Sequence, residues 1–420
     1  MSDGVIVVGA GHAAGAFAAA LRQGGYADRI TLIGAESLAP YQRPPLSKAW
    51  LKGETATDEL LLRPLAFYAE KAIELRLATR VVSIDRAGRR VALDTGERLG
   101  YDRLVLATGS RLRPLDVPGV HSRGVFELRT VADAQNIKSA LGPGKRLAVI
   151  GGGYIGLEVA ASARALGAEV LLIERESRLL ARVASATLSD YYARCHADHG
   201  VAIVLGATVA GFDEISGSLS GVRLADGRAF ACELALVGIG ALANDALAVA
   251  AGLDSRGGVV VDGTAMTSDP AIYAIGDCTS RPIPRYRRSM RLESVPNALE
   301  QAKQAAAAIC GKPPPKPELP WFWSDQYDVR LQIAGLAIDV AQQVVRGDPG
   351  SGRFAVFHLD AAGCLQALEA VNSPAEFIAG RQWVAAHQVI DPARAADPAL
   401  SVKHIVDPLA PGAAAGAAPA

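Results

Sequence analysis

One pattern occurs twice in this chain and limits the folds open to it: an apolar strand, a glycine turn and an alanine-rich helix. It reads VIVVGAGHAAGAFAAALRQGG from Val5 and LAVIGGGYIGLEVAASARALG from Leu147. Each copy is half of a βαβ unit, and glycines spaced in this way between strand and helix are typical of dinucleotide binding. Two copies in the same context predict an α/β fold with two Rossmann-like dinucleotide-binding domains.

The glycine turns place a phosphate site at the start of each helix. In the first copy, Gly9 permits the tight turn, Gly11 lets a pyrophosphate approach the backbone, and Ala14 takes the helix-packing position. The free N–H groups at the helix start, at His12 and Ala13, are expected to hold the phosphates. The corresponding residues of the second copy are Gly151, Gly153, Tyr154, Ile155 and Gly156.

A carboxylate follows the second copy at the distance expected for a ribose contact. The strand EVLLIE ends in Glu174, which can accept hydrogen bonds from both ribose hydroxyls of NADH and would repel a 2′-phosphate. Arg175 could instead accommodate the 2′-phosphate of NADPH, but a solvated charge at the strand end is the simpler interpretation of this arginine. NADH is therefore the expected donor. In the first copy Gly34 stands where the acid usually lies, and the carboxylate comes later, at Glu36.

Two further strands bracket the second repeat. YDRLVLATGSRLRPL (101–115) contains the small-residue turn Ala107, Thr108 and Gly109, and ELALVGIGALAND (233–245) contains the turn at Gly240. These turns are candidate cofactor contacts, and they stand where the chain would leave a nucleotide-binding domain. We therefore expect an NAD-binding domain (112–241) inserted into an FAD-binding domain made of two pieces (1–111 and 242–315).

The second piece contains TSDPAIYAIGDCTS, a strand that ends in Gly276 and Asp277. Asp277 is placed to accept a hydrogen bond from a hydroxyl of the ribityl chain of a flavin, although an aspartate at a strand end is often only a helix cap. A proline-rich run, KPPPKPELP, then marks a linker. Alternating segments followed by a helix predict a C-terminal α+β domain (316–407), and the low-complexity tail (408–420) is expected to be disordered.

Charge and cysteine content exclude several classes of protein. Lysine plus arginine and aspartate plus glutamate each number 43, so there is no overall basic field of the kind that nucleic-acid binders use. The five cysteines contain no closely spaced pair, which indicates a reducing compartment and argues against a metal site. With no basic leader and no apolar run long enough to span a bilayer, we expect a cytoplasmic protein without a membrane anchor.

Several motifs together are more specific than the glycine turns. GAGHAAG, PYQRPPLSK, LVLATGSRLRPL, VIGGGYIGLEVAASA, TSDPAIYAIGDC, RLESVPNALEQA and PWFWSDQY resemble the NADH-dependent ferredoxin reductases that serve bacterial oxygenases. The likeness runs in one register over about residues 4 to 400. It implies a glutathione-reductase-like fold with FAD as cofactor and NADH as donor. It also implies that an acidic two-iron two-sulfur ferredoxin is the acceptor and feeds a haem-thiolate monooxygenase or a ring-hydroxylating dioxygenase.

The same resemblance implies further FAD contacts, residue by residue. Ala35 stands where relatives often have aspartate, so this ribose contact is either absent or taken over by Glu36. Beyond the first glycine turn, the implied contacts are Ala35, Glu36, Lys48, Val81, Arg129, Asp277 and Val295.

The stretch RPPLSKAW (43–50) holds no cysteine, although several flavoenzymes keep a redox-active cysteine pair at this place. Electrons would then leave directly from the reduced flavin, which argues against a disulfide or peroxide reductase. A reductase for rubredoxin, or a component of a nitrite reductase, remains open. A DNA-binding flavoprotein of the apoptosis-inducing-factor type would have a strongly basic body, unlike this neutral chain.

Three residues are candidates for direct roles in electron transfer. The resemblance pairs Lys48 with Glu158 near the nicotinamide, where the cation would stabilise negative charge on the reduced flavin. Without the resemblance, Lys48 would simply begin a helix. In PWFWSDQY, an extended segment puts Trp321 and Trp323 on one side and Phe322 on the other. Large aromatics are more often core, but the resemblance places Trp323 near the electron exit.

A basic run, RPIPRYRRSMR, contains Arg281, Arg285, Arg287, Arg288 and Arg291. It is either a solvated loop or, together with Lys303, a docking patch for an acidic ferredoxin.

Overall fold

The computed structural model describes residues 3–406, and these divide into two units. Within the described residues, the first unit consists of the chain up to Pro45, Thr55–Arg111 and Ala241–Glu318. The second consists of Leu46–Glu54, Leu112–Gly240 and the chain from Leu319 onward. The tail predicted to be disordered, 408–420, lies outside the described residues.

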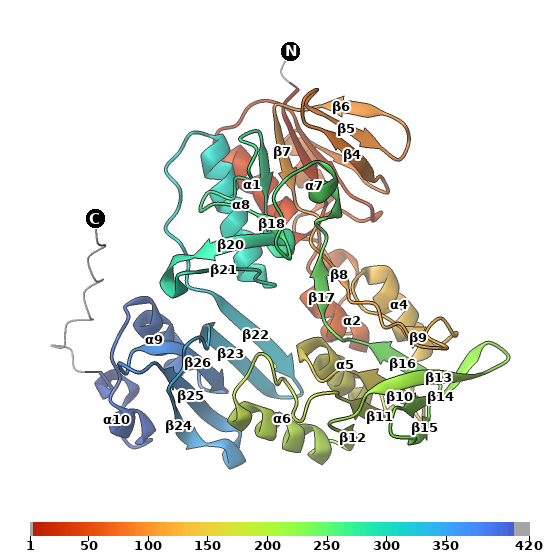
Figure 1. Ribbon diagram of the computed structural model, residues 1–420, viewed down its shortest axis with the longest axis vertical. Coiled ribbons are helices and arrows are strands. Elements are labelled where there is room, and N and C mark those ends of the chain that lie inside the picture. The colour runs from red at the N-terminus through yellow and green to blue at the C-terminus, as the bar shows by residue number, and fades with distance from the viewer. Residues whose placement is uncertain (1–2, 407–420) are drawn as a thin grey trace. The chain divides into compact units, whose positions relative to one another are not determined.

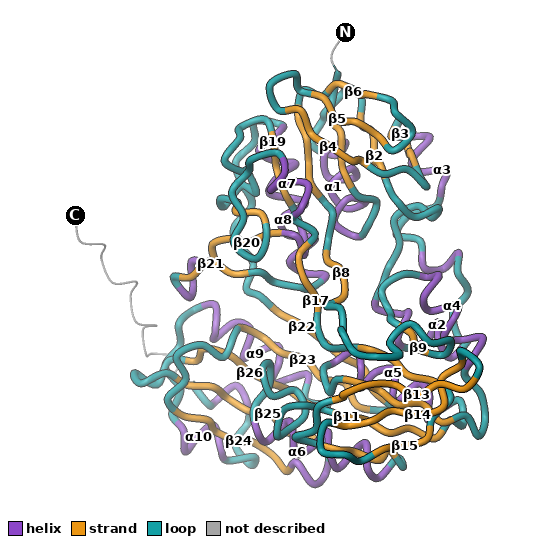
Figure 2. Tube along the Cα trace, turned by 45° about the vertical axis from the view of Figure 1, so that its right-hand side comes forward, coloured by secondary structure: helices purple, strands orange, loops and turns teal. Residues whose placement is uncertain are grey.

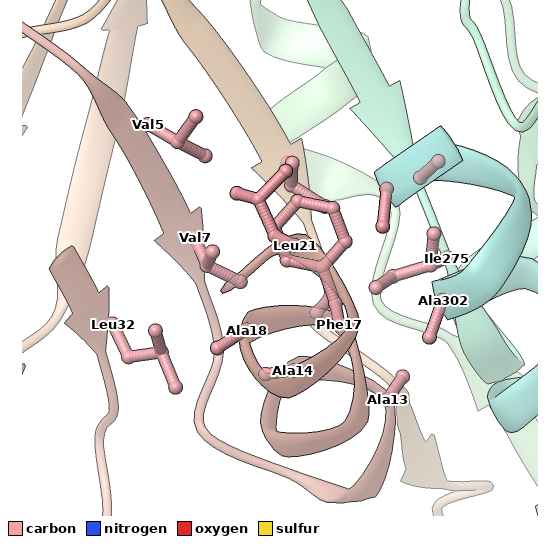
Figure 3. Packing of buried hydrophobic residues seen from close by; sticks show 14 of the residues in the cluster. Val5, Val7, Ala13, Ala14, Phe17, Ala18, Leu21, Leu32, Ile275 and Ala302 are labelled. Carbon is pink, nitrogen blue, oxygen red and sulfur yellow. The ribbon is translucent and has the colours of Figure 1, made fainter. Parts of the chain in front are cut away.

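A five-stranded parallel sheet forms the centre of the first unit, and it contains the first glycine turn. Its order is β3 (Ile73–Arg76), β2 (Ile30–Ile33), β1 (Val5–Val8), β7 (Arg103–Leu106) and β19 (Ile272–Ala274). Helices α1 (His12–Gln23) and α8 (Val295–Ile309) pack together beside it (Figure 1). Phe17 and Leu21 of α1 lie between Val7 of β1 and Ala302 of α8 in this core (Figure 3).

Smaller elements complete the first unit. An antiparallel sheet contains β4 (Val81–Asp85), β5 (Arg90–Leu93) and β6 (Arg98–Gly100). A second small sheet contains β18 (Val259–Val260), β20 (Thr279–Ile283) and β21 (Arg288–Met290). Strand β8 (Ser110–Leu112), at the boundary of the unit, pairs with β17 (Ala241–Ala243). The remaining helices are α3 (Leu65–Glu70) and α7 (Ala246–Ala250).

The second unit contains another five-stranded parallel sheet in the same spatial order. It runs β12 (Val201–Val204), β11 (Glu169–Ile173), β10 (Arg146–Ile150), β16 (Leu234–Val237) and β9 (Val125–Phe126). In this sheet the edge strand β9 precedes the glycine turn in the chain. Its counterpart in the first unit, β19, is the last strand of that sheet in chain order. The two sheets confirm the predicted α/β class with two Rossmann-like domains.

The helices α2 (Ala49–Lys52), α4 (Val131–Ala140), α5 (Tyr154–Ala165) and α6 (Ala186–Asp198) also belong to the second unit. An antiparallel sheet of β13 (Val209–Ile215), β14 (Ser218–Leu224) and β15 (Ala229–Ala231) lies between β12 and β16 in the chain. The two ends of the segment from Arg113 to Gly240 lie side by side, because the N–H of Arg113 donates to the carbonyl of Gly240 at 2.9 Å.

The C-terminal part of the second unit is an antiparallel sheet followed by helices, as the alternating segments predicted. Its order is β22 (Trp321–Gln326), β23 (Val329–Gly335), β26 (Leu365–Val371), β25 (Arg353–Leu359) and β24 (Gln342–Asp348). Helix α9 (Pro374–Ala385) packs on one face of this sheet (Figure 2), and α10 (Pro392–Ala396) follows it. No helix in residues 3–406 is long and apolar enough to cross a membrane.

Candidate active site

The first glycine turn connects β1 to α1 and leaves the start of the helix open. Gly9 has φ +117°, and a Cβ there would lie 2.2 Å from the carbonyl oxygen of Ala107, so only glycine fits. Gly11 caps α1 without a side-chain hydrogen bond, and a Cβ there would meet nothing within 4 Å. The first N–H groups of α1, beginning at His12, therefore receive no side-chain cap from Gly11.

Other predicted FAD contacts meet this turn at the carboxyl edge of the sheet. Gly276, just beyond β19, is close enough to α1 that a Cβ there would lie 3.1 Å from the Cβ of Ala13. Asp277 accepts a hydrogen bond from the Ser110 hydroxyl at 3.2 Å. The Nδ1 atom of His12 is buried without a partner, and burial lowers the pKa of this imidazole.

These groups fit the bound FAD that the fold implies. An uncapped helix start with open space before it binds a pyrophosphate well, because the N–H groups and the helix dipole both favour an anion. The unpartnered nitrogen of His12 adds a further polar atom that a ligand can satisfy.

The remaining predicted FAD contacts are more dispersed. Ala35 follows β2 with an exposed side chain, and the neighbouring Glu36 already binds Arg43 and the Tyr41 hydroxyl, each at 2.6 Å. Those two bonds orient the carboxylate and leave it further acceptor positions. Four contacts lie on other elements. The Thr108 hydroxyl donates to the carbonyl of Asn244 at 2.6 Å, Val81 and Val295 begin β4 and α8, and Arg129 lies before α4 in the second unit.

The second glycine turn repeats this construction. Gly151 has φ +111°, and a Cβ on Gly156 would lie 2.1 Å from the carbonyl of Gly151. Gly153 caps α5 without a side-chain bond and faces open space. Tyr154 and Ile155 form the first turn of α5, while Gly240, with φ +105°, follows β16.

Glu174 lies directly beside this turn. Its carboxylate accepts hydrogen bonds from the N–H groups of Gly152 at 2.6 Å and Glu176 at 2.8 Å. Arg175 points to solvent, with its side chain 73% exposed, and pairs with Glu176 at 3.0 Å. The backbone therefore orients Glu174 at the predicted ribose position, and a carboxylate, rather than a guanidinium, lies next to the turn.

The ion pair expected between Lys48 and Glu158 is present. Residues Pro44–Ser47 form a single 3₁₀ turn, Lys48 follows it, and its Nζ lies 2.7 Å from Glu158 Oε2. The Ser47 hydroxyl donates to the same oxygen at 2.5 Å, and the Ser324 hydroxyl donates to Oε1 at 2.6 Å. Glu158 is only 5% exposed, so its charge is compensated by one cation and two hydroxyl groups.

Strand β22 divides its side chains between two faces, as its alternation predicted. Trp321 and Trp323 lie on one face with ring centroids 5.4 Å apart, and Trp321 also contacts Phe377 of α9. Phe322 lies on the other face, 4.5 Å from the ring of Tyr154. Ser324 shares that face and binds Glu158, a contact that the sequence analysis did not predict.

Neither hypothesis for the basic run, a solvated loop or a docking patch, was right for Arg281. The segment forms the hairpin of β20 and β21 instead of an irregular loop. Arg281 is buried, and its guanidinium binds both carboxylate oxygens of Glu300 at 2.8 and 2.9 Å. Arg287 and Arg288 are exposed at the hairpin end, and Lys303 pairs with Glu318 at 3.1 Å. Only part of the run is therefore on the surface.

All five cysteines are free, and none lies in the stretch 43–50. Cys278 is fully buried beside Asp277, and burial raises the pKa of its thiol. Within residues 3–406, no group of three or more histidine, cysteine, aspartate or glutamate side chains could hold a metal ion.

Comparison with known proteins gives consistent matches over nearly the whole chain. Residues 3–302 match the family model described as pyridine nucleotide-disulphide oxidoreductase, and residues 321–406 match the one described as reductase C-terminal. A protein named probable ferredoxin reductase CtmF, from Castellaniella defragrans, is 50% identical over 402 residues, which cover 96% of this chain and 98% of that protein.

A further relative and a solved structure match this chain to a similar extent. The ferredoxin–NAD(+) reductase component of the anthranilate 1,2-dioxygenase system of Burkholderia cepacia is 42% identical over 402 residues, covering 96% of this chain and 99% of that protein. The solved structure of the covalent putidaredoxin reductase–putidaredoxin complex matches with a TM-score of 0.93 at 40% identity, covering 96% and 97% of the two chains.

Proposed function

Because the chain belongs to the pyridine nucleotide-disulphide oxidoreductase family, we propose that it is an FAD-dependent ferredoxin reductase. It takes electrons from NADH and passes them one at a time to a two-iron two-sulfur ferredoxin. The relatives named above support this acceptor, since each is a ferredoxin reductase and one is a component of an oxygenase system. The ferredoxin would in turn feed a haem-thiolate monooxygenase or a ring-hydroxylating dioxygenase.

The observation that carries this proposal is the pair formed by Lys48 and Glu158. Where thiol-based flavoenzymes keep a cysteine pair, this chain has a 3₁₀ turn followed by a lysine that is held by a buried carboxylate. Bound FAD supplies the chemistry that side chains lack, because it accepts two electrons together and releases them singly. With no thiol in this stretch, the chain offers no disulfide step between donor and acceptor.

The role of Lys48 follows from electrostatics. A fixed cation lowers the energy of negative charge that develops next to it, and burial strengthens the effect. Glu158 keeps the ammonium group in one position, and the hydroxyls of Ser47 and Ser324 keep the carboxylate in place. Lys48 is therefore the residue assigned to stabilise reduced flavin, with Glu158 as its anchor.

The two nucleotides are assigned to the two glycine turns. We assign FAD to the turn before α1, within a domain of residues 1–111 and 242–315, and NADH to the turn before α5, within residues 112–241. The uncapped starts of α1 and α5 support this assignment, as does the orientation of Glu174. Residues 316–407 would form the third domain, with Trp323 of β22 near the electron exit.

An acidic ferredoxin needs a basic surface for fast encounter, and the exposed end of the β20–β21 hairpin supplies one. Arg287 and Arg288 lie there. We also place the protein in the cytoplasm, where its five reduced thiols are stable.

The test is reconstitution from purified components. The isolated protein should contain one FAD and should reduce a two-iron two-sulfur ferredoxin from NADH, as measured by the change in cluster absorbance. The panel of acceptors should include several ferredoxins, a rubredoxin and a nitrite reductase. Reduction of rubredoxin with no ferredoxin active would replace the proposed acceptor, and activity that required a thiol would overturn the mechanism.

A further inference from the structure

A line of hydrogen bonds continues from Glu158 away from Lys48. Ser324 donates to Glu158 Oε1 at 2.6 Å, and Gln326 Nε2 donates to the Ser324 hydroxyl at 3.1 Å. Gln326 Oε1 lies 2.8 Å from His196 Nε2, and the Tyr327 hydroxyl lies 3.3 Å from His196 Nδ1. All of these residues belong to the second unit, so the line is internal to it.

The direction of every bond in this line follows from the charge on Glu158. An ionised carboxylate only accepts, so the hydroxyl proton of Ser324 must point to Glu158. The Ser324 oxygen must then accept from the NH₂ group of Gln326, which turns the amide oxygen toward His196. His196 must in turn carry its proton on Nε2 and accept the Tyr327 proton at Nδ1.

The surroundings of His196 suit this neutral form. The ring is completely buried, and burial lowers its pKa to about 4 even though the Gln326 bond acts in the opposite sense. The ionisable rings around it are those of Tyr192, Tyr327 and His199, together with the thiol of Cys195 on the same helix. Within residues 3–406, no carboxylate is bonded to this imidazole that would keep a second proton on it.

Tyr327 ends the line under backbone strain. It has φ +53°, a conformation that favours glycine, and its ring stacks on the exposed His199 with centroids 3.7 Å apart. Strain of this kind persists only where neighbouring contacts hold the residue in place. The contacts here are the stack on His199 and the bond to His196.

We propose that Ser324, Gln326, His196 and Tyr327 form a positioning array that fixes Glu158 and, through it, Lys48. Every bond in the array donates toward the carboxylate, so the array favours one orientation of an ionised Glu158. None of the four residues needs to touch the nucleotides; they act through Glu158. This inference rests on the proposed function, because it assigns the Lys48–Glu158 pair to the redox site.

The first test is the protonation of His196 in the FAD-bound protein. Nitrogen-15 histidine labelling separates the two neutral tautomers by NMR, and the His196 signal is identified by its loss in His196→Gln. At pH 7 we expect the Nε2-protonated form in the wild type and a mixture of tautomers in Gln326→Leu. The opposite tautomer in the wild type would overturn the array, because every bond in it would then be reversed.

The second test is the rate of flavin reduction by saturating NADH in stopped flow. Gln326→Leu and Ser324→Ala should slow it by about threefold to tenfold, the effect of losing one hydrogen bond, with half-saturation by NADH unchanged. Ser324→Thr keeps the hydroxyl and should restore the rate. Gln366→Leu is the matched control, because Gln366 is also a buried strand glutamine, on β26, but binds Asp360.

If Gln326→Leu fails to fold or to hold FAD, Tyr327→Phe removes one hydroxyl at the outer end and tests the same array. If Ser324→Ala, Gln326→Leu and Tyr327→Phe all showed the wild-type rate and the wild-type tautomer, the proposal would be wrong. The four residues would then be buried residues with no positioning role. Neither measurement uses ferredoxin, so a wild-type protein that reacts with NADH but not with ferredoxin would contradict only the proposed function.

Discussion

Trp323 and Ser324 are consecutive residues of β22, and their side chains leave opposite faces of the strand. The Trp323 ring lies 5.4 Å from that of Trp321, whereas the Ser324 hydroxyl donates to buried Glu158 at 2.6 Å. One strand therefore carries both the proposed electron exit and a direct contact to the ion pair that we assign to the redox site. Changes on either face can be tested separately.

Replacing Lys48 with alanine should slow flavin reduction by NADH by at least about tenfold, because a preorganised cation is lost. Stopped-flow absorbance at saturating NADH measures this rate. Lys52→Ala is the matched control, since Lys52 ends the short helix α2 that Lys48 precedes but pairs with the exposed Glu54. Equal rates in Lys48→Ala and the wild type would remove Lys48 from the mechanism.

Replacing Glu174 with alanine should reduce the preference for NADH over NADPH. Each tenfold loss in the ratio of kcat/KM values corresponds to about 1.4 kcal/mol of discrimination. Ferricyanide reduction with each nucleotide provides the measurement. Arg175→Ala should leave the preference in place, because the Arg175 side chain points to solvent. A wild-type protein that preferred NADPH would contradict the assignment.

His196 should make the protein less stable in acid. The unfolded chain binds a proton at His196 near the ordinary pKa of about 6.5, whereas the folded protein resists protonation until about pH 4. This residue should therefore lower the free energy of unfolding by about 2 kcal/mol between pH 7 and pH 5. Urea denaturation at both pH values should show a smaller loss for His196→Gln, while exposed His121→Gln should behave as the wild type does.

Breaking the buried pair of Arg281 and Glu300 should destabilise the fold. Arg281→Met leaves an unpaired carboxylate in the core, which costs about 3 kcal/mol or more. Arg287→Met, at the exposed end of the same hairpin, should change the free energy of unfolding by less than about 0.5 kcal/mol. Chemical denaturation of both variants distinguishes the structural arginine from the surface one, and similar values would contradict this division.

Neutralising Arg287 and Arg288 to glutamine should lower the rate of ferredoxin reduction at low salt. Encounter between the redox partners depends on complementary charge, and the Debye length falls from about 30 Å at 0.01 M to about 8 Å at 0.15 M. The defect should therefore shrink as ionic strength rises, while ferricyanide reduction stays near the wild-type rate. A double variant that equals the wild type at every salt concentration would place the docking surface elsewhere.

Local patterns were enough to predict the framework of the site. The turns at Gly9 and Gly151 could be predicted because their spacing expresses a steric requirement within a few residues. The same holds for the position of Glu174, which follows from the length of one strand–helix–strand unit. The pairing of Lys48 with Glu158 depended on the family resemblance, since no local pattern relates two residues so far apart.

Long-range contacts explain what the sequence could not predict. Arg281 lies in a run of arginines typical of a solvated surface, and only the fold brings Glu300 of α8 to its guanidinium. Gln326 and His196 meet because β22 passes beside α6, which no spacing indicates. One signal was missed: Phe322, Ser324 and Gln326 alternate along a strand, so the sequence could have predicted two polar side chains on the face that begins with Phe322.

The hydrogen bond between Arg113 and Gly240 bears on how such a chain can be rebuilt. It joins the two ends of the segment that we propose as an inserted NADH-binding domain, in which the edge strand β9 pairs with the last strand, β16. A segment with adjacent ends can be placed in a surface turn of a host without separating any of the host strands. If this segment is the NADH-binding domain, as proposed, a chimaera that takes residues 113–240 from another reductase should acquire the nucleotide preference of that protein. The exchanged segment must then keep the equivalents of Glu158 and His196, because their partners Lys48 and Gln326 lie outside it.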